Sequence, residues 1–319
     1  MYTNMIQNWE KKGFIFKTEG THDWSVSHAQ VPFAHPLKNG NIRVFFATRD
    51  AQSCSSVSFV DVHAENPAHL VYVHDKAVLS KGKKGYFDDA GTMPSWFVPH
   101  EGKLYLYYTA WNKSETASYI LSIGLAVSED EGYTFTKMFE GPIMDRGKYD
   151  PIWVGQPCVL KEDGIWKMWY LSCQKIEYIN DHPEPFYNVK YATSKNGIDW
   201  NRTEDVCIDF NSETDAIGRP CVWKENGIYK MLHSNRKAAA YRDDKTQSYR
   251  ICYSESEDGI HWKERNDIFS FPKSNEGWDS LMNEYCSVYH HMGKTYMLYN
   301  GNGFGASGFG YAVLKTAAK

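Results

Sequence analysis

A strand-turn-strand motif returns five times along the chain, and this repeat limits the possible folds more than any single residue does. Each copy has a short apolar run, a turn that ends in Gly, and a second run rich in Tyr, Trp, Leu and Met. The copies begin at Val31, Met93, Gln156, Arg219 and Tyr285. The second residue of each copy is an anchor (Pro32, Pro94, Pro157, Pro220 and Cys286), and successive anchors are 62, 63, 63 and 66 residues apart. The repeats therefore use nearly all of the 319 residues.

A repeat built only from strands and turns cannot bury both faces of its small sheet alone, so such sheets pack radially around an axis. The sequence therefore predicts an all-β fold, a five-bladed β-propeller. A second series of hairpins supports this prediction, since Ser128, Ser194 and Ser256 recur 66 and 62 residues apart. Asn-Gly or Asp-Gly in these hairpins supplies the positive φ of a tight turn.

The two ends of the chain fit one closed ring. The last repeat offers a third strand at residues 310–314 and no fourth, whereas residues 9–16 resemble the fourth strand expected at residues 262–269. We expect the ring to be closed by the N-terminal strand pairing with the last blade, because closure removes open sheet edges. No linker interrupts the repeats, so a single domain over residues 1–319 is expected.

Composition narrows the classes of partner. The net charge is −4, from 35 basic and 39 acidic residues, and no basic run stands out, so neither nucleic acid nor an anionic membrane is expected as a partner. No segment approaches the apolar length of a membrane span. The seven cysteines are odd in number and contain no C-x-x-C pair, which favours reduced thiols, a cytoplasmic location, and no structural zinc. No cofactor is expected.

Strand alternation places the segments before each first strand and the loops after each second strand on one face. Counted 16 or 17 residues from each anchor, the same position holds a different side chain in every repeat: Arg49, Trp111, Gln174, Arg236 and Asn302. A position needed only for folding tends toward one residue in all repeats. Divergence here suggests a ligand without fivefold symmetry, although solvated loop ends would give the same pattern.

The side chains on this face suit a sugar, which is bound through bidentate hydrogen bonds and stacking on aromatic rings. A small-molecule sugar or oligosaccharide is therefore the expected partner. The predicted substrate-binding residues are Arg49, Asp23, His28, Gln30, Asp88, Trp111, Gln156, Gln174, Asp215, Arg219, His233, Arg236, Asn300 and Asn302.

Glycosidic cleavage needs two carboxyl groups across a cleft. Glu284 is the predicted general acid, because burial near the channel would keep it protonated; an ion pair with Arg219 or Arg236 is the alternative. Asp50 is a predicted base or nucleophile unless Arg49 neutralises it, and Asp89 is the third catalytic candidate.

Other acids and histidines near this face have simpler interpretations. Asp150 and Asp279 precede their anchors by seven residues, as a recurring structural Asp would. His28 and His233 could bind a metal, but no third ligand matches them in spacing, so no metal site is predicted.

The motifs S-x-N-G-x-x-W at residues 194–200, S-E-D-G-x-x-W at 256–262 and Y-x-Y-Y-T-A-W ending at Trp111 resemble the five-bladed propellers of glycoside hydrolase families 43, 32, 68, 117 and 130. The resemblance spans the whole chain and implies a glycosidase architecture. It does not carry the family 43 catalytic triad, because Val31, Gln156 and Gly218 stand at the positions of its three acids. The invertase motif Asn-Asp-Pro is absent as well.

Three functions follow from these observations. The first is a glycoside hydrolase that uses carboxylates at the mouth of the propeller channel. The second is a phosphate-dependent glycoside phosphorylase or transferase, which the arginines on the face favour and which resembles family 130. The third is a carbohydrate-binding protein without catalysis, consistent with the missing triad.

Overall fold

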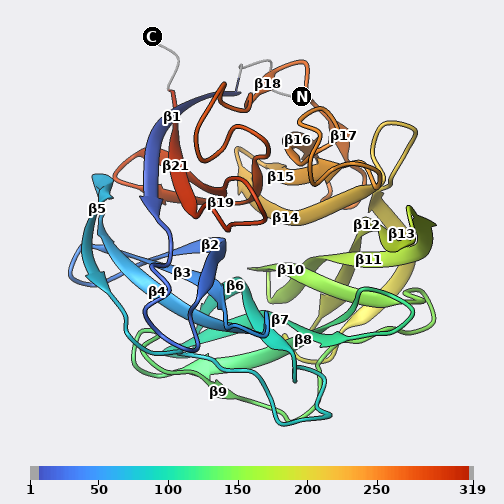
Figure 1. Cartoon of the computed structure of the whole chain (residues 1–319), viewed down its shortest axis with the longest axis horizontal. Coiled ribbons are helices and arrows are strands. Elements are labelled where there is room, and N and C mark those ends of the chain that lie inside the picture. The colour runs from blue at the N-terminus through green and yellow to red at the C-terminus, as the bar shows by residue number, and fades with distance from the viewer. Residues whose placement is uncertain (1–6, 316–319) are drawn as a thin grey trace.

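The computed structural model describes residues 7–315, and in that range every regular element is a β-strand. Figure 1 shows the strands grouped around a common centre, in the manner of a propeller. Within the same residues, nothing helical is long and apolar enough to cross a membrane. The all-β prediction is therefore confirmed, and so is the propeller-like arrangement.

Each group of strands is an antiparallel meander, in which every strand pairs with the next along the chain. The first two run β2 (Ser27–Pro36), β3 (Ile42–Arg49), β4 (Ser55–His63), β5 (Asn66–Val73), then β6 (Gly91–His100), β7 (Lys103–Lys113), β8 (Tyr119–Ser128), β9 (Thr136–Lys137). The next two run β10 (Trp153–Glu162), β11 (Ile165–Ile179), β12 (His182–Ser194), β13 (Asn201–Ile208), then β14 (Ala216–Glu225), β15 (Ile228–Arg236), β16 (Arg250–Ser256), β17 (Lys263–Glu264). The last contains β19 (Glu284–His291), β20 (Lys294–Asn300) and β21 (Phe309–Leu314).

The first strands of the meanders contact one another in sequence around the centre. β2 contacts β6, β6 contacts β10, β10 contacts β14, β14 contacts β19, and β19 returns to β2. One parallel residue pair also joins β4 to β6, at Ser55 and Gly91, and another joins β12 to β14, at Tyr187 and Ala216. The centre is therefore surrounded by the first strands.

The N-terminal strand β1 (Gln7–Phe16) completes the last meander. It pairs antiparallel with β21, from Trp9 opposite Leu314 to Phe16 opposite Phe309, and the two lie side by side in Figure 1. This pairing confirms the prediction that the N-terminal strand joins the last repeat. The strand expected at residues 262–269 is instead divided into β17, which pairs with β16, and β18 (Phe269–Ser270), which pairs with β1.

A buried Asp ties together the strands within each of three meanders. Asp150 has no exposed surface; it accepts hydrogen bonds from Ser172 Oγ at 2.6 Å and from Tyr170, and its carboxylate pairs with Arg202 at 2.8 Å. The equivalent sets in other meanders are Asp88 with Tyr108 and Lys137, and Asp279 with Tyr299 and Lys11. The structural role predicted for Asp150 and Asp279 agrees with these bonds.

A bulge interrupts each first strand near its anchor. In four strands the residue before the anchor has a positive φ: Val31 53°, Gln156 45°, Arg219 41° and Tyr285 51°. Such angles are sterically costly for residues with a Cβ, above all for a β-branched one. A compensating contact is therefore required.

That contact comes from the preceding meander in every case. The backbone N–H groups donate to side-chain oxygens as follows: Val31 to Asn300 at 2.7 Å, Gln156 to Thr109 at 2.8 Å, Arg219 to Gln156 at 2.7 Å, and Tyr285 to Ser234 at 2.9 Å. These bonds satisfy the buried donors and fix the direction of the side chains at the bulges.

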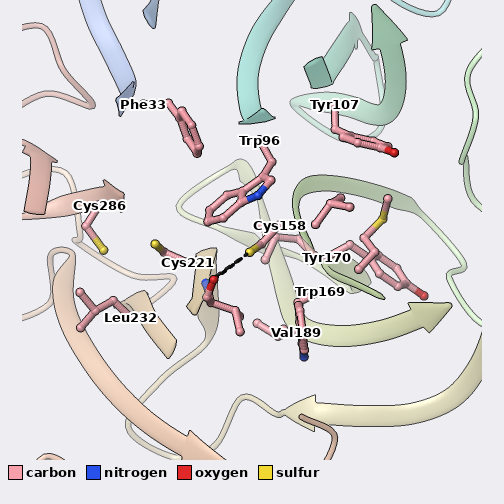
Figure 2. Packing of buried hydrophobic residues seen from close by; sticks show 14 of the residues in the cluster. Phe33, Trp96, Tyr107, Cys158, Trp169, Tyr170, Val189, Cys221, Leu232 and Cys286 are labelled. Atoms are coloured by element: carbon pink, nitrogen blue, oxygen red, sulfur yellow. Dashed lines mark hydrogen bonds between the residues drawn. The ribbon is translucent and has the colours of Figure 1, made fainter. Parts of the chain in front are cut away.

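The core between the meanders is aromatic and contains buried thiols. Figure 2 shows Cys158, Cys221 and Cys286 together near the centre, beside Trp96 and Phe33. The N–H groups of Val222 and Val288 donate to the sulfurs of Cys158 and Cys221 at 3.2 Å, so each sulfur bridges to the next meander. All seven cysteines are free thiols.

The hairpin turns of the second series also join neighbouring meanders. Tyr107 donates through its hydroxyl to the carbonyl of Gly197 at 2.9 Å, and Trp169 Nε1 donates to the carbonyl of Gly259 at 2.7 Å. Within the turns, Ser194 and Ser256 accept from the N–H groups of those glycines. The serines of the hairpins therefore stabilise turns against which the next meander packs.

Closure of the last meander can be tested at Lys11. Its ammonium group lies 2.6 Å from Asp279, which is almost fully buried, so Lys11→Met leaves a buried carboxylate without its cation. We expect a loss of about 3 kcal/mol in the free energy of unfolding, measured by urea denaturation. The neighbouring Lys12→Met is the control, since the partner of Lys12 is Glu10, which is exposed. Equal effects of the two substitutions would contradict this role of β1.

The bulges can be tested at Ser234. Ser234→Ala removes the acceptor of the Tyr285 N–H in a fully buried position, and we expect a loss of about 1 to 3 kcal/mol in the free energy of unfolding. The exposed Ser270→Ala is the matched control and should leave urea denaturation unchanged. A Ser234→Ala protein as stable as the wild type would show that the bulge does not depend on this bond.

Candidate functional site

A pocket of about 320 Å³ collects side chains from most of the meanders. Its walls are rich in aromatic rings and arginines. The lining residues are Gln30, Arg49, Ser53, Ser55, Met93, Trp111, Ser118, Tyr119, Leu121, Gln156, His182, Arg236, Tyr241, Arg242, Tyr249, Tyr285 and Phe304.

Two features of the repeat deliver side chains to this pocket. Arg49 and Arg236 are the last residues of β3 and β15, and Trp111 lies near the end of β7, so three of the five divergent positions line the pocket. Gln156 and Tyr285 come from the bulges, where the positive φ directs them. The other two divergent residues, Gln174 and Asn302, are not among the lining residues.

Two insertions supply four more lining residues, and the repeat did not predict them. β11 and β12 extend past the length of the other strands to a turn at residues 180–181, which places His182 at the pocket. Residues 237–249, between β15 and β16, bring Tyr241, Arg242 and Tyr249. The sequence signal that could have revealed these insertions is the extra chain length between the second and third strands of the two repeats.

Arg236 is held in a cage of tyrosines. Its Nε donates to the Tyr249 hydroxyl at 3.2 Å, and its guanidinium carbon lies 4.0 Å from the centre of the Tyr241 ring and 5.4 Å from that of Tyr187. Its remaining nitrogens donate to the carbonyls of Lys237 and Pro185. Neighbouring tyrosines raise the pKa of Arg236, in spite of its burial, so this residue is a fixed positive charge.

Arg49 is less completely engaged. Its Nε donates to Gln30 Oε1 at 2.9 Å, and Gln30 Nε2 in turn faces the sulfur of Met93 at 3.2 Å. Burial lowers the pKa of Arg49, while the nearby Tyr285 and Glu284 oppose the shift. His28 lies near this arginine, and burial and the positive charge of Arg49 lower the pKa of its imidazole to about 4. His28 is therefore neutral at physiological pH.

Glu284, the predicted general acid, lies at the start of β19 beside Tyr285 and has no exposed surface. Neither carboxyl oxygen accepts a hydrogen bond of ordinary geometry from the described residues. Burial raises the pKa of Glu284 well above its ordinary value, and the positive charges of Arg236 and Arg49 offset this only in part. Burial therefore favours the protonated form of the carboxyl, and none of the ion pairs among the described residues includes it.

The other two predicted catalytic acids have partners of their own. Asp50 accepts from the N–H groups of Gln52 and Cys54 and pairs with Lys81 at 3.2 Å. Asp89 accepts from Asn112 Nδ2 at 2.7 Å and from the N–H of Gly85 at 2.9 Å. Neither residue is among those that line the pocket.

Arg219, a predicted substrate-binding residue, is buried and is not among the residues that line the pocket. It is 3 % exposed, its Nη2 donates to the carbonyl of Pro32 at 3.0 Å, and its Nη1 has no hydrogen-bond partner among the described residues. Burial lowers the pKa of Arg219 to about 10, and it remains charged at neutral pH. Its guanidinium group connects β14 to β2.

Several predicted binding residues hold loops or strands together. Asp215 accepts from the N–H of Ala238, at the start of the 237–249 insertion. Asn300 bridges to β2 through the N–H of Val31 and the carbonyl of Ala29. Asn302 accepts from the N–H groups of Leu281 and Met282 and donates to Gly277.

The remaining predicted residues also lie outside the pocket lining. His233 uses both ring nitrogens within its meander, at Asn235 and Ser254, and burial lowers its pKa to about 4. Gln174 donates to Ser172, Asp88 belongs to the buried Asp set described above, and Asp23 is exposed in a turn. The structure thus brings together Gln30, Arg49, Trp111, Gln156 and Arg236, with Glu284 next to them.

Comparison with solved structures identifies the fold. A glycosyl hydrolase from Bacteroides ovatus matches with a TM-score of 0.72 at 16% identity, over 97% of this protein and 94% of that one. A structure from the GH130 family of mannoside phosphorylases, which contains glycoside hydrolases that target β-1,2 mannosidic linkages, matches with a TM-score of 0.71 at 15% identity, over 98% and 95% of the two proteins. No family model matches the sequence.

Sequence comparison finds relatives of nearly the same length. An uncharacterized protein of Mycobacterium tuberculosis (strain CDC 1551 / Oshkosh) is 34% identical over 308 residues, 96% of this chain and 99% of the relative. A 1,2-β-oligomannan phosphorylase of Thermoanaerobacter sp. is 28% identical over 167 residues, 51% of this chain and 53% of the phosphorylase. The chain therefore has the fold of these solved structures, and it belongs to the same family as the Mycobacterium tuberculosis protein.

Proposed function

We propose that the protein is a carbohydrate-processing enzyme of the glycoside hydrolase type, with the pocket as its active site and Glu284 as its general acid. The observation that carries this proposal is the place of Glu284, a fully buried carboxyl beside Tyr285 whose pKa burial raises, with the positive charges of Arg49 and Arg236 close enough to oppose the shift. A general acid must hold a proton at neutral pH and release it when the leaving oxygen develops charge. Burial shifts the pKa of this carboxyl in the direction that a general acid needs.

The pocket walls support a sugar as the ligand. Partly exposed Trp111, Tyr119 and Tyr285 offer ring faces for stacking, and Gln30 and Gln156 offer amides for hydroxyl groups. Burial keeps the pKa values of Tyr119 and Tyr285 well above the ordinary value, so both hydroxyls stay neutral donors. The arginines favour a sugar that carries a negative charge.

The finer architecture belongs to the same proposal. We take the meanders to be five blades of one propeller domain over residues 1–319, with the pocket at one mouth of its channel. The seven free thiols are consistent with a cytoplasmic location. Asp50 and Asp89 remain the candidates from sequence for a second catalytic carboxyl.

A phosphorylase is the second candidate function, and one observation favours it. Arg49, Arg236 and Arg242 line the pocket, whereas no carboxylate is among the lining residues in the described chain. Guanidinium groups bind phosphate through paired hydrogen bonds. The likeness to a 1,2-β-oligomannan phosphorylase over half of the chain points the same way.

Turnover tests the proposed function directly. The purified protein is assayed against 4-nitrophenyl glycosides, uronides and β-1,2-linked manno-oligosaccharides, each with and without inorganic phosphate. Hydrolysis releases the free sugar under both conditions, whereas phosphorolysis yields a sugar 1-phosphate only when phosphate is present. We expect Glu284→Gln to lower kcat about 100-fold or more on the substrate found, with little change in KM.

The matched control is Glu65→Gln, in the exposed turn between β4 and β5. It should turn over substrate like the wild type. A Glu284→Gln enzyme with unchanged kcat would remove Glu284 from the acid role. Sugar binding without any turnover, seen by calorimetry with the same compounds, would favour a carbohydrate-binding protein.

The protonation of Glu284 also predicts how stability depends on pH. The folded state retains a proton that the unfolded chain releases above the ordinary pKa of 4.5, so the stability due to this group is complete below that pKa. It is lost as pH rises toward the raised folded pKa. We therefore expect the Tm of Glu284→Gln, relative to that of the wild type, to increase as the pH is raised from about pH 5 to about pH 8. A constant difference in Tm across this window would contradict the protonated state.

A further inference from the structure

The pocket requires a group that accepts a proton, and its lining offers one suitable side chain. In hydrolysis with inversion, a base removes a proton from the attacking water while the acid protonates the leaving oxygen. The arginines of the lining are cations. Burial raises the pKa of each of its four tyrosines, so their hydroxyls keep their protons at neutral pH. Its serine, amide, indole and thioether groups are not basic. Among the lining residues, His182 alone has an imidazole, a side chain whose ring nitrogen can accept a proton.

His182 is oriented by a buried carboxylate that sequence reasoning did not single out. Its Nδ1 lies 2.9 Å from Glu184 Oε1, and both residues stand on β12 where it extends beyond the other third strands. The Glu184 side chain is 3 % exposed, while the His182 side chain is 48 % exposed. The carboxylate is therefore inside the wall, and the imidazole is open to the pocket and solvent.

The carboxylate lies against Nδ1 and biases the tautomer of the imidazole. Because a carboxylate has no proton to donate, its contact with Nδ1 at 2.9 Å favours the ring that carries its proton on Nδ1. In the neutral ring Nε2 then has the free lone pair. Within residues 7–315, Nε2 of His182 makes no hydrogen bond that would occupy this lone pair.

Glu184 is itself held in place from the second insertion. Arg242 Nη1 donates to the same Oε1 atom, so the carboxylate links the β11–β12 extension to the 237–249 insertion, and both form pocket walls. Its other oxygen, Oε2, is buried without a partner among the described residues. The negative charge of Glu184 can therefore stabilise the imidazolium that forms when Nε2 takes a proton.

We propose that His182 is the general base of the pocket and that Glu184 is its positioning residue. This proposal rests on the proposed function. Water loses a proton to His182 Nε2 as its oxygen forms a bond to the anomeric carbon, and the bond from that carbon to the leaving oxygen breaks. The leaving oxygen takes the proton of Glu284. After the product leaves, His182 gives up its proton and Glu284 regains one, so that protons and charge balance over one turnover.

Two substrates with different leaving groups separate the roles of the acid and the base. Fluoride departs from a glycosyl fluoride without a proton, so Glu284→Gln should remain active on the fluoride of the sugar identified in the screen. His182→Gln keeps a polar side chain of similar size but cannot take a proton, and we expect kcat to fall about 100-fold or more on both the fluoride and the aryl glycoside. Azide, which needs no base, should restore turnover of the fluoride by His182→Gln.

His69→Gln is the matched control, because His69 is exposed on β5 and lies against His63. It should behave like the wild type with both substrates. A His182→Gln enzyme that loses affinity but keeps kcat, or that azide does not rescue, would overturn the assignment of the base while leaving Glu284 and the proposed function intact. Loss of turnover in the wild type with every sugar would instead overturn the proposed function.

A measurement without substrate tests the base by itself. Long-range nitrogen NMR of the histidine-labelled protein distinguishes a ring protonated at Nδ1 from one protonated at Nε2, and the signals of His182 are those missing in His182→Gln. At alkaline pH we expect protonation at Nδ1 and a bare Nε2. A ring that carries its proton on Nε2 could not act as this base, and that result would overturn the proposal whatever the turnover.

Discussion

The hydrogen bond that crosses from one meander to the bulge of the next is the constraint on which the pocket depends. Positive φ angles at Val31, Gln156, Arg219 and Tyr285 turn these residues out of the regular strand pattern, and a side-chain oxygen of the preceding meander holds each bulge. The same bonds that join the ring thus orient residues at its centre. Functional side chains here stand on rigid strands, and their direction is set by neighbouring repeats.

Burial affects the acidic and the basic groups near the pocket differently. Burial raises the pKa of Glu284 and so favours its neutral form, whereas Arg236 stays charged within a cage of tyrosines and backbone carbonyls. Arg219, deeper still, has one nitrogen without a partner in the described structure. A buried carboxyl with a raised pKa near cations is an arrangement that active sites use.

The sequence repeat predicted the strands well because period and turn chemistry are local properties. It also predicted that β1 joins the last repeat and that Arg49, Trp111 and Arg236 point to one place. It did not predict His182, Arg242 or Tyr241, since insertions have no counterpart in the other repeats. Nor did it show that Asp215 and Asn302 would bind backbone groups, because the spacing of a residue does not tell which partner its side chain will meet.

Pairing of β1 with β21 has a consequence for how the chain reaches its native state. These strands are about as far apart in sequence as the chain allows, so the ribosome makes one of them long before the other exists. β1 is made first, but its partner strand β21 is made last. Until synthesis is nearly finished, β1 therefore has no strand to pair with. Contacts between segments that are distant in sequence form slowly, and until they form, unpaired strand edges that are prone to aggregation stay exposed. Translation speed and chaperone access should therefore influence the yield of native protein.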